Sequence, residues 1–257
     1  MNKNPNDTVQ QIKHLASMLK LPNIACYEKH ISNEDSFKKN LMNLLYIEYN
    51  TKERQRIERR VKYAGFPVSK TLDTFDKNRF EFLKPAVIDD VATCKFIEET
   101  KNCIAISNSG MGKTHLSIAV GYCAIQKGYS VKFRSASDLI NQLREAQNKK
   151  TLCRYLKILT KCDLLILDEV GYLPYTSKEC NLLFQVLAGR YERKSTFVTS
   201  NLVFSDWIKF LGNQTLATAI VDRLIHNSII LNMNGDSYRI KDNKKNANDL
   251  FDKKELI

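Results

Sequence analysis

The sequence predicts an α/β protein: a three-layer sandwich with a central parallel sheet, preceded by a small domain made only of helices. Two observations predict this class. From about residue 86 onward, apolar runs of strand length alternate with stretches of helical periodicity, which is typical of a parallel sheet with helices on both faces. The first 65 residues carry helical periodicity alone.

The N-terminal domain is expected to contain two helices. Ile12, Leu15 and Leu19 recur at helical spacing before Pro22, and a second helical pattern begins at Phe37. The second helix is expected to continue as far as residue 62, because glycine and proline follow at positions 65 and 67.

The end of this second helix is strongly basic. It carries six basic residues, of which Lys52, Arg54, Arg56, Arg59 and Arg60 are candidates for binding a ligand, and four of these (52, 56, 59 and 60) share one face. Such a stripe can bind the phosphates of nucleic acid, so we interpret it as a candidate DNA-binding surface. A charged face that contacts only solvent is the open alternative.

The remainder of the chain divides into a connector over residues 66–85, an α/β domain over residues 86–240 and a mixed-charge tail over residues 241–257 that is expected to be disordered. Strands are expected at residues 103–106, 130–134, 164–167, 196–199 and 229–231. The helices between them are expected at residues 113–127, 136–147, 152–160, 177–191, 204–210 and 216–226.

The segment after the first expected strand has the pattern of a phosphate-binding P-loop. It comprises Ser107, Asn108, Ser109, Gly110, Met111, Gly112, Lys113, Thr114 and His115. Loop amides and a helix N-terminus hold phosphates, Lys113 can reach the β and γ phosphates, and the Thr114 hydroxyl can ligate Mg²⁺. Ser107 stands where the usual motif has glycine, and a Gly-Lys-Thr turn without a ligand is the alternative.

A pair of carboxylates follows the apolar strand 164–167. Asp168 and Glu169 lie about 55 residues after the loop, at the carboxyl end of a parallel strand, where ligands bind in open α/β sheets. Asp168 can hold Mg²⁺, and Glu169 can orient and polarise the water that attacks the γ-phosphate. The sequence therefore predicts an enzyme that binds ATP and Mg²⁺ and hydrolyses the ATP.

Two further polar residues are candidates for the site. Asn201 follows the strand 196–199 and can position the attacking water or sense the γ-phosphate, or it can simply cap a helix. Arg223 is expected at the end of a helix before the last strand, where it can act as an arginine finger on the ATP of a neighbouring subunit. A basic residue at a helix C-terminus is also an ordinary partner of the helix dipole.

The composition indicates a cytoplasmic protein with a polyanionic partner. Lysine and arginine total 40 against 28 acidic residues, and the resulting net charge of +12 attracts nucleic acid, although a general lysine bias would give the same excess. Neither a signal peptide nor a run of ~20 apolar residues is present, so no membrane association is expected. Seven cysteines without a C-x-x-C pair predict neither disulfides nor a zinc site.

Several segments together resemble one protein family. They are Lys-Thr-Leu-Asp-Thr-Phe-Asp (70–76), Gly-Met-Gly-Lys-Thr-His-Leu (110–116), Leu-Leu-Ile-Leu-Asp-Glu-Val-Gly-Tyr-Leu-Pro (164–174), Asn-Leu-Leu-Phe-Gln (181–185), Arg-Tyr-Glu-Arg (190–193), Thr-Ser-Asn (199–201), Phe-Ser-Asp-Trp (204–207) and Asp-Arg-Leu-Ile-His (222–226). The combined pattern is similar to the IstB-type ATP-binding helpers of insertion-sequence transposases, relatives of the helicase loader DnaC and the initiator DnaA in the AAA+ superfamily of P-loop NTPases.

The resemblance implies an AAA+ ATPase that oligomerises on double-stranded DNA, shares ATP sites between subunits and activates a partner transposase. The roles that it implies are Walker A for Lys113 and Thr114, Walker B for Asp168 and Glu169, sensor 1 for Asn201 and arginine finger for Arg223. The residues after the last expected strand are too few for a C-terminal lid domain, so none is expected. Part of the nucleotide pocket must then come from the connector or from a neighbouring protomer.

Three other functions stay open from the sequence. A DnaC-like loader of a replicative helicase would have the same fold. A DNA-binding switch would hold ATP without hydrolysing it because of Ser107. A small-molecule P-loop kinase is disfavoured, because such an enzyme has no need of Glu169 beside the metal carboxylate.

Overall fold

The structure, a computed structural model, describes residues 5–171 and 174–234. The chain divides into two compact units, Met1–Arg59 and Arg60–Ile257. This division comes shortly before the expected boundary at residue 65, because the last turn of the long helix belongs to the second unit, where Lys132 Nζ donates a hydrogen bond to the Tyr63 carbonyl (2.6 Å). The expected tail over residues 241–257 and the segment in which a lid would lie are outside the described residues.

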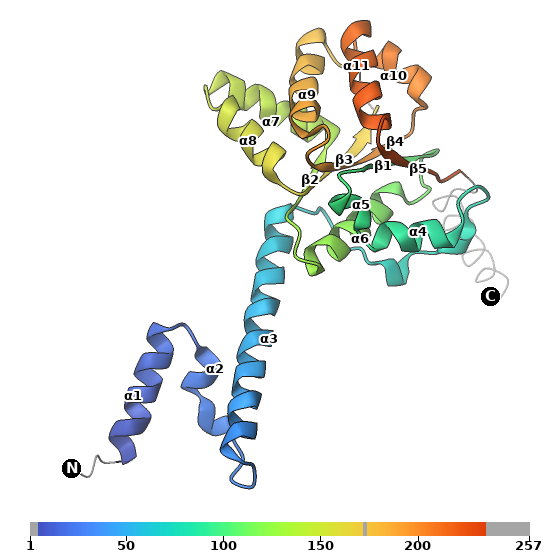
Figure 1. The fold of residues 1–257 in the computed structure, drawn as a ribbon. Coiled ribbons are helices and arrows are strands. Elements are labelled where there is room, and N and C mark those ends of the chain that lie inside the picture. Colours follow the sequence, from blue (N-terminus) through green and yellow to red (C-terminus); the bar gives the residue numbers. More distant parts are fainter. Residues whose placement is uncertain (1–4, 172–173, 235–257) are drawn as a thin grey trace, which may run out of the picture. The chain divides into compact units, whose positions relative to one another are not determined.

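The first unit is helical, as expected. It contains α1 (Pro5–Met18), α2 (Pro22–Ala25), a 3₁₀ turn (Tyr27–Lys29) and most of α3 (Phe37–Ala64) (Figure 1). The sequence predicts α1 and α3, but α2 is too short to show a period. Pro22 starts α2, and the carboxylate of Glu48 accepts the Asn23 N–H (2.9 Å), which provides the cap that the preceding leucine cannot.

The second unit contains one sheet of five parallel strands in the order β2-β3-β4-β1-β5. The strands are β1 (Asn102–Ile106), β2 (Val131–Ser135), β3 (Leu164–Val170), β4 (Ser195–Ser200) and β5 (Ser228–Asn232). All five expected strands are confirmed. Every residue of β4 is buried, as are the middle residues of β1, since neighbouring strands and helices cover them on all sides.

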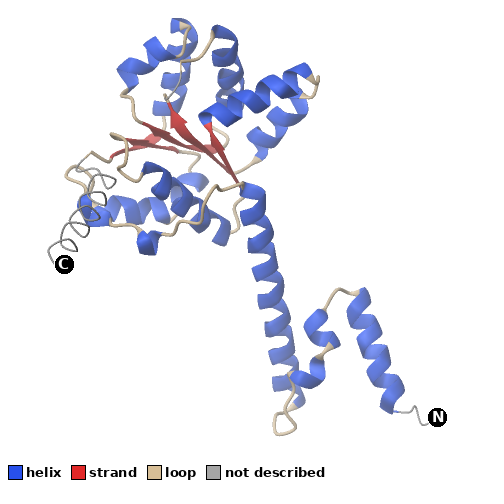
Figure 2. Cartoon of the chain, turned by 180° about the vertical axis from the view of Figure 1, so that it is seen from behind, coloured by secondary structure: helices blue, strands red, loops and turns tan. Residues whose placement is uncertain are grey.

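Helices cover both faces of the sheet, which confirms the three-layer architecture (Figures 1 and 2). One face carries α4 (Pro85–Ala92), α5 (Lys95–Glu98) and α6 (Lys113–Gln126). The other face carries α7 (Ala136–Asn148), α8 (Leu152–Lys161), α9 (Ser177–Arg190), α10 (Phe204–Phe210) and α11 (Gln214–Ile225). The six expected helices of this unit are confirmed to within a few residues, whereas α4 and α5 were not individually expected.

A buried hydrophobic cluster fills the space between the sheet and helices α7 to α11. Leu139, Leu143, Leu183, Val186 and Trp207 are almost completely buried in it. This core fixes β3 and β4 side by side, so the polar residues that follow their apolar stretches are brought together at one edge. Within residues 5–171 and 174–234, no helix is long and apolar enough to cross a membrane.

Candidate functional site

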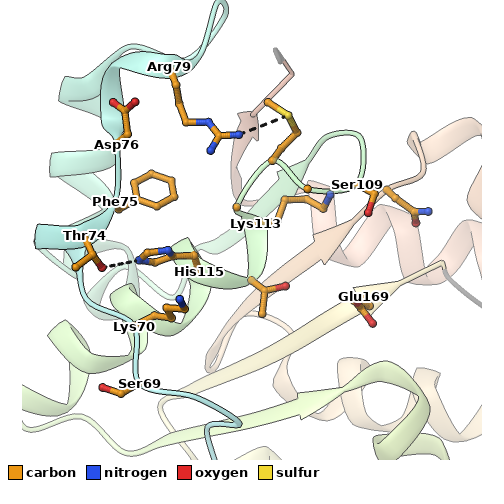
Figure 3. A pocket seen from close by; sticks show the side chains of 15 residues that line it. Ser69, Lys70, Thr74, Phe75, Asp76, Arg79, Ser109, Lys113, His115 and Glu169 are labelled. Carbon is orange, nitrogen blue, oxygen red and sulfur yellow. Dashed lines mark hydrogen bonds between the residues drawn. The ribbon is translucent and has the colours of Figure 1, made fainter. Parts of the chain in front are cut away.

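A pocket of about 680 Å³ lies at the carboxyl edge of the sheet (Figure 3). Its walls come from the connector, from the loop before α6 and from the ends of β3 and β4. The lining residues are Ser69, Lys70, Thr74, Phe75, Asp76, Arg79, residues 109–115, Glu169 and Asn201. Its volume is within the range of small-molecule and cofactor sites.

The loop before α6 takes a conformation that needs glycine at two positions. Gly110 and Gly112 have positive φ angles of 80° and 89°. A Cβ at Gly112 would lie 3.2 Å from the ring of Phe75 and would sit on a strained backbone. With these glycines, the chain turns directly from β1 into the first turn of α6, whose residues Lys113, Thr114 and His115 line the pocket.

Ser107 replaces the first glycine of the usual motif without backbone strain, because its φ is not positive. Its buried hydroxyl donates to the Asn108 carbonyl (3.1 Å) and accepts from Lys113 Nζ (3.1 Å). Lys113 Nζ also donates to the carbonyls of Ser107 (2.7 Å) and Asn108 (2.8 Å). Ser107 and Asn108 thus contact Lys113 without lining the pocket, whereas the expected residues 109–115 do line it.

Thr114, which lines the pocket, contacts the buried Asp168. The Thr114 hydroxyl lies 3.0 Å from both carboxylate oxygens of Asp168. Burial raises the pKa of the Asp168 carboxyl, and the hydrogen bonds from Thr199 and Thr114 oppose this shift. A carboxylate beside a threonine hydroxyl is a ligand set for Mg²⁺, so the residues present fit this ion together with a bound triphosphate.

β3 contains a bulge at the two carboxylates. Leu167 pairs with Val198, but the next pair is Val170 with Ser200, so Asp168 and Glu169 both lie opposite one residue of β4. Glu169 has a φ of 60°, a left-handed conformation that costs roughly 1–3 kcal/mol in a non-glycine residue. The strand was expected to end at residue 167 and instead continues to Val170, because pairing resumes beyond the bulge.

The bulge separates the two acidic side chains. Asp168 is 5 % exposed and contacts Thr114, whereas Glu169 is exposed and lines the pocket. In a regular strand, neighbouring side chains point to opposite faces of the sheet. The extra residue therefore allows both carboxylates to reach the same site.

The connector forms one wall of the pocket. His115 Nε2 lies 2.8 Å from the Thr71 carbonyl, and the ring of Phe75 packs edge-on against His115 at 5.2 Å. Arg79 donates to the sulfur of Met111 in the loop (3.7 Å). Sequence reasoning expected a contribution from the connector or from another protomer, but it assigned no role to Thr71, Phe75 or Arg79. The aromatic residue within the polar segment 70–76 was the available signal.

Asn201 and Arg223 have different positions relative to the pocket. Asn201 follows β4 and lines the pocket. Arg223 does not: its guanidinium lies over the rings of Phe184 (4.8 Å) and Tyr191 (5.8 Å) and donates to the Ala219 carbonyl (3.0 Å). The structure therefore does not bring Arg223 to the site of its own chain.

The basic stripe of α3 is divided between the two units. Lys52, Arg54, Arg56 and Arg59 belong to the first unit and are exposed. Arg60 belongs to the second unit and is half-buried, and its Nη1 atom is buried without a hydrogen-bond partner. Of the five expected DNA-binding residues, four are therefore exposed, and two of these, Arg54 and Arg56, pair with Glu58 (3.7 Å) and Glu53 (3.6 Å).

Comparison with known proteins decides the family. Residues 10–247 match the family of IstB-like ATP-binding proteins. The chain belongs to this family. A relative from Pseudomonas aeruginosa, named for insertion sequence IS21 and for ATP binding, is 37 % identical over 242 residues, which cover 92 % of this chain and 91 % of the relative. A relative from Geobacillus stearothermophilus, named for insertion sequence IS5376 and for ATP binding, is 39 % identical over 209 residues, which cover 81 % and 83 %.

Solved structures identify the fold of this IstB-like protein. A crystal structure of the DnaC helicase loader matches with a TM-score of 0.56 at 23 % identity, over 69 % of this chain and 99 % of that chain. The replication initiator DnaA, bound to AMPPCP and single-stranded DNA, matches with a TM-score of 0.58 at 23 % identity, over 72 % and 56 %. The chain is thus an ATP-binding protein with the AAA+ fold of DnaA and DnaC.

Proposed function

We propose that this IstB-like protein is a Mg²⁺-dependent ATPase that oligomerises on double-stranded DNA and activates a partner transposase. The bulge in β3 carries the proposal of hydrolysis, because it supplies a buried carboxylate beside Thr114 and a second, exposed carboxylate in the pocket. The insertion-sequence names of the relatives support the role in transposition. The net charge of +12 and the basic stripe of α3 support a DNA partner.

In this proposal, different residues of the site bind the phosphates, bind the metal ion and activate the attacking water. Lys113 and the amides at the start of α6 hold the phosphates, and Thr114 with Asp168 holds Mg²⁺. A Mg²⁺ ion held there would supply positive charge that offsets the negative charge of the triphosphate. Glu169 orients the attacking water and accepts its proton, and the Asn201 amide helps to position that water. These roles are supported by the positions of Lys113, Thr114, Glu169 and Asn201 along the pocket and by the contact of Asp168 with Thr114.

Two substitutions test this proposal. Glu169→Gln should still bind ATP but hydrolyse it at least ~100-fold more slowly, because it removes the general base. Lys113→Ala should lose ATP binding itself. Phosphate release is measured with and without duplex DNA, and binding is measured with a fluorescent ATP analogue. Glu145→Gln, an exposed carboxylate of α7 outside the pocket, is the control and should leave both quantities unchanged.

Two results would contradict parts of this proposal, the first the role of Glu169 and the second the hydrolysis of ATP. Equal hydrolysis by the wild-type protein and Glu169→Gln would remove Glu169 from the mechanism. A wild-type protein that binds ATP and DNA but releases no phosphate under any of these conditions would instead be a nucleotide-dependent DNA-binding switch.

A further inference from the structure

We propose that Thr199 is a positioning residue that holds Asp168 and Glu169 in their separate orientations, a role that rests on the ATP hydrolysis proposed above. Thr199 lies near the end of β4 and is completely buried. It occupies the position opposite both carboxylates at the bulge. Since it does not line the pocket, it acts through these two neighbours.

One hydroxyl group joins the two acidic residues. Thr199 Oγ1 donates a hydrogen bond to Asp168 Oδ1 (2.6 Å) and accepts one from the backbone N–H of Glu169 (2.9 Å). A threonine hydroxyl has one proton to donate and lone pairs to accept with, so both hydrogen bonds form at the same time. The same atom therefore fixes the side chain of the first acidic residue and the main chain of the second.

The bulge explains why this hydroxyl is needed. A bulged strand leaves a backbone group without its partner in the sheet, and here Thr199 accepts the N–H of Glu169. This contact holds the residue that carries the left-handed φ. Without the hydroxyl, the N–H of Glu169 loses its partner, and Asp168 keeps Thr114 as its remaining hydroxyl donor.

The hydroxyl of Ser200, the next residue of β4, makes different hydrogen bonds. Ser200 Oγ donates to the Val170 carbonyl (2.6 Å) and accepts the N–H of Leu202 (3.1 Å). It therefore fixes the chain after the bulge and the turn that contains Asn201. Among the described hydrogen bonds of β4, the link to both acidic residues belongs to Thr199.

The test compares the full-length variants Thr199→Val, Thr199→Ser and Thr196→Val. Valine keeps the shape of threonine and removes the hydroxyl, and serine keeps the hydroxyl. Thr196 is the matched control, because it is buried in the same strand and its hydroxyl accepts from Arg190 Nε (3.2 Å), away from the pocket. The readouts are kcat for ATP, affinity for a fluorescent ATP analogue and hydrogen exchange of the Glu169 amide.

Thr199→Val should lower kcat by about 10- to 100-fold, as expected when a partner behind a metal ligand is lost, while nucleotide affinity changes less than about threefold. The Glu169 amide should exchange about fivefold faster or more, because it has lost its acceptor. Thr199→Ser should restore both values to within about threefold of the wild type. Thr196→Val should retain the wild-type kcat. If Thr199→Val does not fold, Thr199→Cys, with a weak S–H donor, takes its place.

Three results would overturn the role of Thr199: an unchanged kcat in Thr199→Val, a Thr199→Ser variant as slow as the valine variant, or unchanged exchange of the Glu169 amide. A wild-type protein without ATPase activity would overturn the proposed function separately. The exchange measurement would still decide whether Thr199 sets the backbone of Glu169, because it needs no turnover.

Discussion

The carboxylate of Asp163, the residue just before β3, contacts residues at the starts of β2 and β4. Its Oδ2 atom accepts from the backbone N–H (2.9 Å) and the hydroxyl (2.6 Å) of Ser130, just before β2, and its Oδ1 atom pairs with Lys194 (2.5 Å), just before β4. Burial raises the pKa of Asp163, but the hydrogen bonds from Lys194 and Ser130 outweigh it and lower the pKa to about 2.

This shift predicts a pH-dependent stability. Because the folded pKa is lower than the unfolded pKa of ~4, the contribution of Asp163 is present above pH ~4 and is lost as the pH falls toward 2. Asp163→Asn should lower the free energy of unfolding at pH 7 by about 1 kcal/mol, allowing for solvent screening of this partly exposed pair. Urea unfolding should show this difference shrinking between pH 4 and pH 3.

The control for Asp163 is an exposed ion pair of the same unit. Asp89, paired with Lys77 (2.5 Å), is 59 % exposed, so Asp89→Asn should change the free energy of unfolding by less than about 0.5 kcal/mol. If Asp163→Asn matched Asp89→Asn at pH 7, or if its effect stayed constant down to pH 3, the predicted linkage would be wrong.

At the scale of elements, α3 carries the candidate DNA-binding stripe. Lys52, Arg56 and Arg59 are exposed, and their spacing of four and three residues places them on one face. Replacing all three with alanine should weaken binding to any duplex and flatten the plot of log affinity against log salt by up to about 3 × 0.9 units per protomer. Fluorescence anisotropy at several salt concentrations measures this slope.

Arg60 is left out of this variant because its guanidinium is partly buried and replacing it would also disturb packing. The control replaces Lys13, Lys20 and Lys29 with alanine, which removes the same charge from exposed positions of the same unit outside α3. This control should keep the wild-type slope. An unchanged slope in the α3 variant would show that the stripe is only a solvated face.

At the scale of the whole molecule, Arg223 is predicted to act on the ATP of a neighbouring subunit. In its own chain it lies over Phe184 and Tyr191 and away from the pocket. Arg223→Ala and Glu169→Gln should each be nearly inactive in ATP hydrolysis. A mixture of the two under oligomerising conditions should recover part of the activity, because some sites then combine an intact Glu169 with an intact Arg223 from the next subunit.

The control mixture combines Glu169→Gln with Lys113→Ala. Both changes damage the part of the site that one chain supplies, so this mixture should stay inactive. Co-assembly is verified independently for both mixtures. If the Arg223→Ala mixture never exceeded the sum of its components, Arg223 would be a helix-end charge held by its aromatic neighbours.

Much of the second unit was predictable because its signals are local. A buried strand needs a run of apolar residues, and a helix beside it shows its period, so the five strands and six of the helices follow from short segments. Short helices such as α2 and α5 could not be predicted in this way, since four residues carry no period and their stability comes from packing and capping by distant residues.

The sequence by itself determined the parallel α/β class, the family and the positions of the phosphate loop and the acidic pair, because short segments of consecutive residues carry each of these signals. Only the tertiary structure decided that Asp168 and Glu169 reach the same site, since this depends on a bulge defined by pairing with β4. It likewise revealed Thr199 and the connector wall. Their contacts join residues about 30 and 40 positions apart, and such contacts arise only when the chain folds.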